Sequence, residues 1–432
     1  MRIALYGNNL DAGVILARGL RALGHEARLY APAQAESQDQ HAWWSSQAPE
    51  PGLVRPVPRW HPGSRRPGVD PRLRDELASY DVLCLSEEGP ALLGDIRGPA
   101  KVFLSYGGDL QLYPFRVAQQ LAPRALLAAG REAARTALAG LRRGDPTPAR
   151  RLPLEGGRAL VAAIRLQRRQ RAGLRRCSAF LVAGYQLPLL RRLGLSAERA
   201  TCLPVPCDPH LLGEVDLAAR ESARQATAGL GLVLLHPTRQ FWLRLDGNPF
   251  LKDNHKLLRA CAGLLPRART PARLYLLRKG RPDDIAASER LVRELRLEPL
   301  VEWLPELPHR LLRAWYELET VVVCDQFNPS LPSLGSIGRE ATWFGRPLVT
   351  AFDPASAALT YGDPAGPPNL FPATSEGEIL AALERVEEMS AGERLDRAAA
   401  ARAWFAAHLS VEALAPRYAQ VFEQARRARI VE

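Results

Sequence analysis

The sequence predicts an α/β protein with two domains, each a parallel sheet covered by helices on both faces. The chain opens with an apolar strand at 2–6, an amphipathic helix at 14–23 and a second strand at 26–31, the order of a βαβ unit. An apolar run at 320–324, followed by a glycine-bearing loop, is typical of a second buried parallel strand. At 432 residues the chain is long enough for two domains of ordinary size.

We expect the N-terminal domain to span residues 1–205. Residues 33–75 are rich in Pro, Gly, Arg and Trp and predict a long surface loop. Arginines recur at helical spacing through 116–176, with a break at 144–148, which predicts a basic helical insertion. Further strands of this domain are predicted at 81–85, 100–104, 178–182 and 200–204.

A linker is predicted at 206–230, a second domain at 231–405 and a terminal helix within 406–432. The strands of the second domain are predicted at 230–235, 273–277, 301–304, 320–324 and 348–350. Its helices, with the terminal one, are predicted at 255–265, 286–295, 308–318, 339–344, 376–389, 391–407 and 411–427.

Composition excludes several classes of protein. The hydrophobic fraction is 47% and the charged fraction 24%, as in globular proteins, and no apolar run is long enough to cross a bilayer. The chain begins with a strand in place of a signal peptide, so we expect a cytoplasmic protein. The net charge is +12, and 54 of the 58 basic residues are Arg. With 7% aromatic residues and no nucleic-acid-binding motif, we expect no nucleic-acid partner.

Metal and redox sites are not expected either. The six cysteines are scattered without a C-x-x-C pair, and the eight histidines are dispersed. The opening βαβ unit lacks G-x-G-x-x-G, which disfavours a dinucleotide cofactor. The sequence therefore predicts no cofactor and no metal.

A candidate anion site follows the apolar run at 320–324. The loop carries Gly335 and Ser336, and a helical segment containing Glu340 comes next. Free backbone N–H groups and the helix dipole at such a junction favour negative charge. Glu340 would lie in the first turns of the helix, where a carboxylate can reach ribose hydroxyls.

This stretch resembles the nucleotide-sugar loop of family-4-like glycosyltransferases with the GT-B fold. The family pattern is a Glu, a Gly-Phe-Gly, about three apolar residues, Glu-Ala and Gly-x-Pro-Val. The matching positions here are Gly335, Glu340, Ala341, Gly345 and Pro347. The first Glu of the pattern falls on Pro332. Because that Glu contacts the donor sugar in the family, the nearest upstream carboxylate, Asp325, is the candidate to replace it.

The resemblance implies a GT-B fold of two Rossmann-like domains with a C-terminal helix that crosses back to the first domain. It also implies sugar transfer with retention, without a metal, because an Arg–Lys pair stabilises the departing diphosphate. Arg239 follows the first strand of the second domain, and Lys252 opens the next helix. Gly335, Ser336 and Glu340 would hold phosphate and ribose, and the loop after Leu304 would seat the base. The alternative for Arg239 and Lys252 is that they only solvate a loop and a helix start.

The acceptor side is assigned by the same resemblance to the N-terminal domain. Gly108 and Asp109 follow the strand at 100–104, where the family has a His-Gly-x-Asp-like sequence, although Tyr106 replaces the His. The resemblance makes Asp109 a catalytic candidate, together with Arg239 and Lys252. Further acceptor candidates are Asn8, Asn9 and Gly13. Structural alternatives remain open: Asp109 or Glu340 can cap a helix, and the two asparagines can shape a turn.

We therefore expect a cytoplasmic glycosyltransferase that uses a nucleotide-sugar donor and a glycan or lipid-linked acceptor. Two alternatives stay open: a non-catalytic GT-B subunit that binds a partner or membrane, and a GT-B nucleotide-sugar epimerase. The basic helices at 116–176 are either solvated surface helices or a peripheral contact to the anionic inner face of the cytoplasmic membrane.

Overall fold

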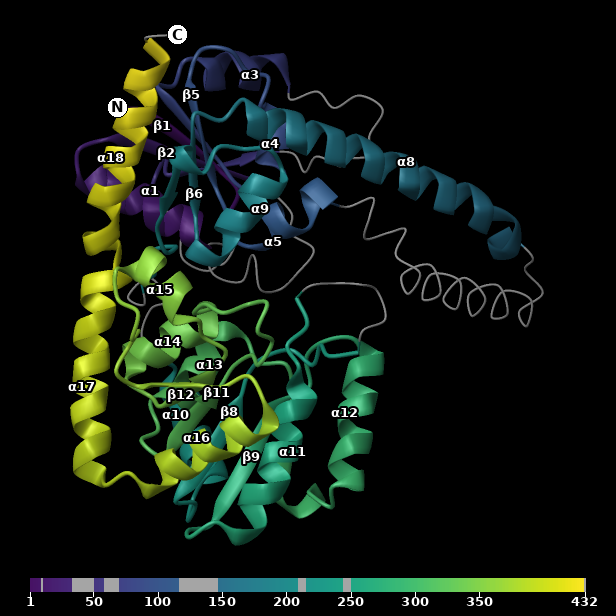
Figure 1. The fold of residues 1–432 in the computed structure, drawn as a ribbon, viewed down its shortest axis with the longest axis vertical. Coiled ribbons are helices and arrows are strands. Elements are labelled where there is room, and N and C mark those ends of the chain that lie inside the picture. The colour runs from purple at the N-terminus through teal and green to yellow at the C-terminus, as the bar shows by residue number, and fades with distance from the viewer. Residues whose placement is uncertain are drawn as a thin grey trace.

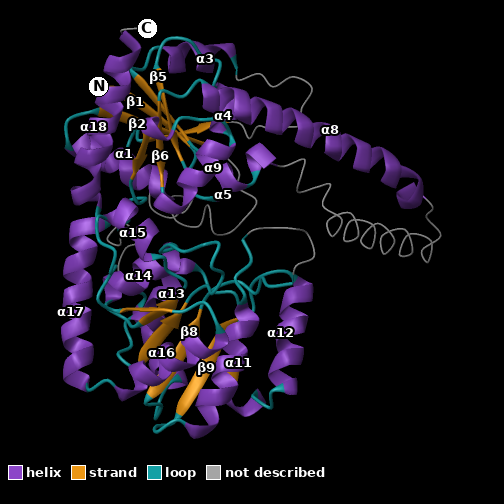
Figure 2. Cartoon of the chain, viewed as in Figure 1, coloured by secondary structure: helices purple, strands orange, loops and turns teal. Residues whose placement is uncertain are grey.

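A computed structural model describes residues 1–8, 11–32, 50–57, 70–115, 147–208, 215–243 and 250–430. Two parallel sheets, one of seven strands and one of six, form two domains along the chain (Figure 1). Figure 2 shows the strands of each domain enclosed by helices. Asn9 and the first basic segment, 116–143, lie outside the described residues.

The N-terminal sheet has the order β3-β2-β1-β4-β5-β6-β7, all parallel. Its strands are β1 (Arg2–Tyr6), β2 (Glu26–Pro32), β3 (Val54–Val57), β4 (Val82–Leu85), β5 (Ala100–Leu104), β6 (Ala179–Val182) and β7 (Ala200–Cys202). The helices around it are α1 (Ala12–Ala22), α3 (Pro71–Ala78), α4 (Gly89–Leu93), α5 (Gly108–Gln111), α8 (Thr147–Arg175) and α9 (Leu187–Arg192).

Two local predictions for this domain were wrong. Part of the predicted loop 33–75 forms strand β3 and the start of α3, because a short edge strand tolerates Pro56 where a central strand would not. The predicted break at 144–148 is also partly helical, since α8 already includes Thr147 and Pro148. Proline is accepted there because the first turn of a helix has unpaired N–H groups.

The C-terminal sheet has the order β10-β9-β8-β11-β12-β13, also parallel. Its strands are β8 (Leu232–His236), β9 (Ala272–Leu277), β10 (Val301–Leu304), β11 (Val321–Cys324), β12 (Leu348–Thr350) and β13 (Leu370–Pro372). Its helices are α10 (Leu217–Ala226), α11 (Asn254–Leu264), α12 (Pro282–Glu294), α13 (His309–Tyr316), α14 (Ser336–Phe344), α15 (Pro354–Tyr361), α16 (Glu376–Glu388) and α17 (Ala391–His408). Helix α10 lies within the predicted linker 206–230 and packs on α13 of the second domain.

The last helix, α18 (Val411–Ile430), returns to the N-terminal domain (Figure 1). Leu414, Tyr418 and Phe422 are fully buried and belong to the same apolar core as strands β1, β4 and β5. The approach to α1 is close, because a β-carbon at Gly19 would lie 2.5 Å from a methyl of Val411. Burying this face stabilises the crossing in proportion to its apolar area.

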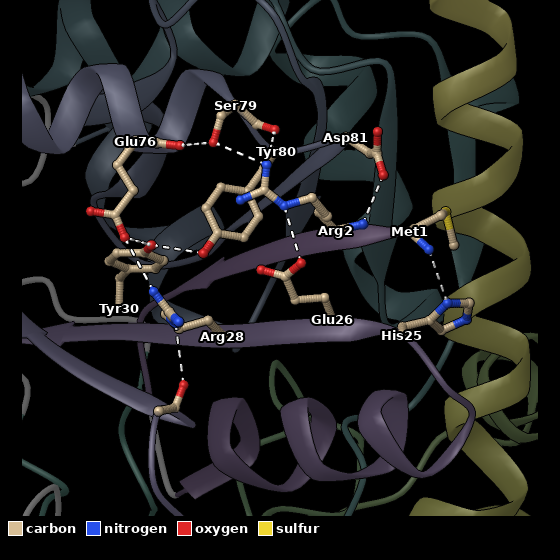
Figure 3. A network of polar contacts seen from close by, with 11 residues as sticks. Met1, Arg2, His25, Glu26, Arg28, Tyr30, Glu76, Ser79, Tyr80 and Asp81 are labelled. Carbon is tan, nitrogen blue, oxygen red and sulfur yellow. Dashed lines mark hydrogen bonds and ion pairs between the residues drawn. The ribbon is translucent and has the colours of Figure 1, made fainter.

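The amino edge of the N-terminal sheet is closed by polar contacts (Figure 3). The Arg2 guanidinium pairs with Glu26 at 3.1 Å and donates to the Ser79 carbonyl at 2.9 Å. Beside it, the Tyr30 hydroxyl donates to Glu76 at 2.6 Å. These bonds join strands β1 and β2 to the end of α3.

The two domains also touch where their carboxyl-edge loops meet. The Gly184 N–H donates to Thr360 Oγ1 at 2.8 Å, and the Tyr185 N–H donates to Ser356 Oγ at 2.9 Å, which joins the end of β6 to α15. A β-carbon at Gly107 would lie 3.7 Å from the Tyr185 hydroxyl and 4.0 Å from the Phe250 ring. The loop after β5 therefore lies against the loop that leads to α11.

Candidate functional site

The site is built on the carboxyl ends of β8 and β11, the two central strands of the second sheet. His236 is fully buried, and its Nδ1 lies 2.7 Å from the Cys324 carbonyl while its Nε2 lies 2.7 Å from Asn254 Nδ2. Burial lowers the pKa of His236 to about 4, so the ring is neutral. Asn254 also donates to the Arg239 carbonyl at 3.1 Å, which fixes the start of the loop that carries the candidate cations.

Arg239 and Lys252 come together at this edge. The Arg239 guanidinium lies over the Phe241 ring, 5.8 Å from its centroid. The Lys252 backbone N–H donates to the Phe241 carbonyl at 2.6 Å, which brings the two ends of the intervening loop together. Burial lowers the pKa of Lys252, the Asp325 carboxylate opposes that shift, and the Arg239 charge adds to it.

Asp325 lies between these cations and helix α14. Its side chain is buried, with 2% of the residue exposed, and Oδ1 accepts a hydrogen bond from Thr238 Oγ1 at 2.7 Å. Its Oδ2 faces Gly335, where a β-carbon would lie 3.4 Å away. Burial raises the pKa of Asp325, while Lys252 and Thr238 oppose the shift.

Helix α14 begins three residues earlier than predicted, at Ser336, with Gly335 as its N-cap. No side chain caps it, so its first N–H groups have no side-chain acceptor. Glu340 is 6% exposed in the second turn and does not cap this helix. Its charge raises the pKa of the buried Tyr316 hydroxyl, after burial itself, and opposes the lowering of the Arg313 pKa.

Leu304 ends β10, the edge strand two positions away from β8. Its carbonyl accepts a hydrogen bond from the Arg278 N–H at 2.8 Å. The Arg278 guanidinium lies 5.5 Å from the ring centroid of Trp303. The loop predicted to seat a base therefore leaves the same carboxyl edge as the candidate phosphate site.

Asp109, on the N-terminal side, is held by its own domain. The residue is 4% exposed, and its carboxylate accepts hydrogen bonds from four groups. The donors are Ser105 Oγ at 2.8 Å, Leu110 N at 2.9 Å, Glu87 N at 3.1 Å and Tyr106 N at 3.1 Å. This geometry supports the capping alternative, in which Asp109 shapes the loops after β4 and β5. Gly108 begins the short helix α5 in that same loop.

Asn8 and Gly13 shape the loop between β1 and α1. Asn8 Oδ1 accepts the Val14 N–H at 3.1 Å, and its Nδ2 donates to Asp11 at 3.2 Å. A β-carbon at Gly13 would lie only 2.6 Å from the Gly7 carbonyl oxygen, so the close approach requires glycine. These contacts support the turn alternative for Asn8.

Three residues that the sequence analysis missed also lie at these edges. Glu87 has a left-handed backbone, φ 53°, and burial raises its pKa to about 8, with Glu88 and Asp109 adding to the shift. Tyr185 hydrogen-bonds Ser333 through its side chain, across the two domains. Gln326 contacts Lys252. Among them, Glu87 carries a signal that sequence could have supplied, because it is a carboxylate two residues after a predicted strand.

The described residues contain no group of three or more His, Cys, Asp or Glu side chains arranged to hold a metal ion. In the same part of the chain, no helix has the length and hydropathy needed to span a membrane.

Two Rossmann-like domains joined by a returning C-terminal helix define a GT-B fold, as the sequence predicted. Solved structures with this fold match the whole chain at low identity. HepE from Anabaena, solved in complex with UDP and glucose, shares 14% identity at a TM-score of 0.62, covering 98% of this chain and 99% of that one. Sucrose-phosphate synthase from Thermosynechococcus elongatus shares 16% identity at 0.58, covering 99% and 100%.

A third solved structure is the catalytic domain of starch synthase IV from Arabidopsis thaliana, bound to ADP and acarbose. It shares 10% identity at a TM-score of 0.60, covering 99% of both chains. No protein-family model and no curated protein sequence matches this chain.

Proposed function

We propose that this chain is a glycosyltransferase that transfers a sugar from a nucleotide-diphosphate donor to a glycan or lipid-linked acceptor, with retention. The observation that carries the proposal is that Arg239 and Lys252 lie close enough to interact electrostatically, while Asp325, which interacts with Lys252, faces Gly335 at the uncapped start of α14. A departing diphosphate needs fixed positive charge, and these groups supply it without a metal. In HepE and starch synthase IV, complexes with UDP and ADP support a nucleotide ligand for this fold.

In this proposal each group at the C-terminal edge has one task. Arg239 and Lys252 bind the diphosphate, together with the N–H groups at Gly335 and Ser336. Glu340 holds the ribose, the loop after Leu304 seats the base, and Asp325 contacts the donor sugar in place of the family's first Glu. No cofactor takes part, because the nucleotide sugar is itself the substrate.

The N-terminal edge takes the acceptor in the same proposal. Gly13, Gly108, Asn8 and Asn9 are the acceptor-side residues that the resemblance assigns, and Asn8 shapes the loop after β1. Asp109 acts there by holding the loops after β4 and β5 in place, since its carboxylate already accepts four hydrogen bonds.

The first test is thermal stabilisation by UDP-, GDP-, ADP- and dTDP-sugars. A ligand at 100 times its dissociation constant stabilises a protein by about 2.7 kcal/mol, which is readily detected. We expect one nucleotide class to stabilise the protein. Lys252→Ala should abolish that stabilisation and lower turnover about 100-fold, by analogy with the loss of one transition-state donor. Lys101→Ala, the same loss of charge in the other domain, is the control.

Two outcomes favour other functions. A folded protein that binds a nucleotide sugar but never turns it over with cell lipids or glycans is a non-catalytic subunit, a reading that Pro332 motivates. A nucleotide sugar interconverted without any acceptor identifies an epimerase. Stabilisation by no nucleotide at all contradicts the proposal.

Peripheral membrane binding from the cytoplasmic side is part of the proposal. Helix α8 extends away from the N-terminal domain (Figure 1), and Arg168, Arg175 and Arg176 are exposed towards and just beyond its C-terminal end. Such clusters are attracted to anionic lipid. The protein should co-sediment with phosphatidylserine vesicles at low salt and be released at high salt. Equal binding to neutral vesicles would contradict an electrostatic contact.

A further inference from the structure

Gln326 joins the two loops of the candidate donor site. It follows Asp325 at the end of β11 and is only 4% exposed. Its Oε1 accepts a hydrogen bond from Lys252 Nζ. Its Nε2 donates to the Leu331 carbonyl at 3.0 Å and to the Ser333 carbonyl at 3.4 Å.

The backbone of Gln326 is equally fixed. Its carbonyl accepts the Ala351 N–H at 2.7 Å and the Thr350 hydroxyl at 3.1 Å, both from the end of β12. The side chain therefore starts from a backbone that is hydrogen-bonded between the ends of β11 and β12. Because both ends of its amide are engaged, the group cannot rotate without losing contacts on Lys252 or on the 331–333 loop.

An amide suits this position because it accepts from Lys252 and donates to two carbonyls at once. A carboxylate could accept from Lys252 but could not donate to the Leu331 and Ser333 carbonyls, and it would neutralise the lysine. A neutral amide orients the ammonium and leaves its charge available to an anion. The loop it fixes includes Pro332, which lacks the carboxylate that the resembling family places there.

We propose that Gln326 is a positioning residue that holds the Lys252 ammonium and the 331–333 loop in one arrangement around the donor. It acts through Lys252 on the diphosphate and through the loop backbone on the sugar. This inference rests on the proposed function. It states that one side chain, Gln326, couples the position of Lys252 to that of the 331–333 loop.

The test is a double-mutant cycle on the purified full chain. Nucleoside diphosphate binding is measured by calorimetry for wild type, Gln326→Met, Lys252→Met and the double variant, using UDP and ADP as probes. We expect Gln326→Met to weaken binding about tenfold or more, the range for losing a hydrogen bond to a charged group. In the Lys252→Met background the same change should cost little, because coupled residues are not additive.

A second variant adds a pH signature. Gln326→Glu places a carboxylate on Lys252, so its binding loss should exceed that of Gln326→Met at neutral pH and shrink in acid as the carboxylate protonates. Asn369→Leu removes another buried amide of the domain, one that donates to the Arg346 carbonyl, and controls for general loss of packing. It should leave nucleotide binding unchanged.

A measurement without nucleotide distinguishes failure of the Gln326 proposal from failure of the proposed function. The chain has four lysines, so selective carbon-13 labelling of lysine gives four resolvable side-chain signals. Gln326→Met should shift the Lys252 signal and leave Lys101 unchanged. If wild type binds the nucleotide and the losses in the two single variants add up in the double variant, the Gln326 proposal is overturned and the proposed function is not. An unchanged Lys252 signal also overturns it, whereas absence of nucleotide binding in wild type overturns the proposed function as well.

Discussion

Two buried aspartates, one at the carboxyl edge of each sheet, are held in different ways. Asp109 follows β5, and its carboxylate accepts four hydrogen bonds from its own domain. Asp325 follows β11 and accepts one hydrogen bond, from Thr238, while its Oδ2 faces Gly335. Burial raises the pKa of both carboxyls, and Lys252 opposes that shift only at Asp325. Equal burial therefore says little about role, and the remaining hydrogen-bonding capacity of the carboxylate is the better guide.

The largest effect expected from this comparison is on stability. Asp109→Ala leaves four buried donors without their acceptor and should lower the free energy of unfolding by about 3–5 kcal/mol. Asp325→Ala removes one hydrogen bond and should cost only about 1–2 kcal/mol. Urea denaturation of both variants measures the difference. Equal losses would break the distinction between the two edges.

A smaller effect is expected on the pH dependence of stability below neutral pH. It arises from His236, at the carboxyl edge of the C-terminal sheet. His236 keeps a pKa of about 4 when folded, while the unfolded residue has its ordinary value near 6.5. Between these values the unfolded chain binds the proton and the folded protein does not, so stability falls as pH falls. The loss should total about 3 kcal/mol from pH 6.5 to 4. The contribution of His236 is isolated by measuring the free energy of unfolding against pH for wild type and for His236→Gln. Equal slopes in the two proteins would contradict this assignment.

The smallest effect is a loss of stability as pH rises. It arises from Glu87, at the carboxyl edge of the N-terminal sheet. The folded pKa of Glu87 is raised to about 8, so from about pH 4.5 upward only the unfolded chain is ionised there. Stability should therefore fall as pH rises toward 8, by on the order of 2 kcal/mol, because the group is partly exposed. Glu87→Gln should remove this slope and leave the His236 slope in place. Chemical denaturation at pH 5, 6.5 and 8 distinguishes the two.

The two strands that the sequence did not predict, β3 and β13, both lie at sheet edges, whereas the edge strands β7 and β10 were predicted. Strands such as β8 and β11 are buried on both faces and read as unbroken apolar runs, which leaves little ambiguity. The edge strand β13 is three residues long, ends in Pro372 and was not predicted, because such a segment carries neither length nor periodicity. Strand β3 was missed for the same reason.

The candidate site divides along a similar line. Arg239 and Lys252 could be placed at one edge because each lies within a few residues of a predicted strand or helix of a parallel sheet, although Lys252 precedes α11 instead of opening it. The role of Gln326 could not be predicted, because it depends on two carbonyls of a loop whose path is set by tertiary contacts. The hydrogen bonding of the Asp109 carboxylate likewise depends on a distant residue, because one of its donors is the N–H of Glu87, which lies 22 residues away in sequence.

Helix α18 also has a consequence for how the protein is made. The core of the N-terminal domain includes Leu414, Tyr418 and Phe422, which follow the entire second domain in the chain. A ribosome therefore extends the chain through all of that domain before the first core can close. Domains usually fold in the order of synthesis. Here the second domain can complete its sheet while the first still exposes the apolar groove for α18, which makes the first domain the later one to mature.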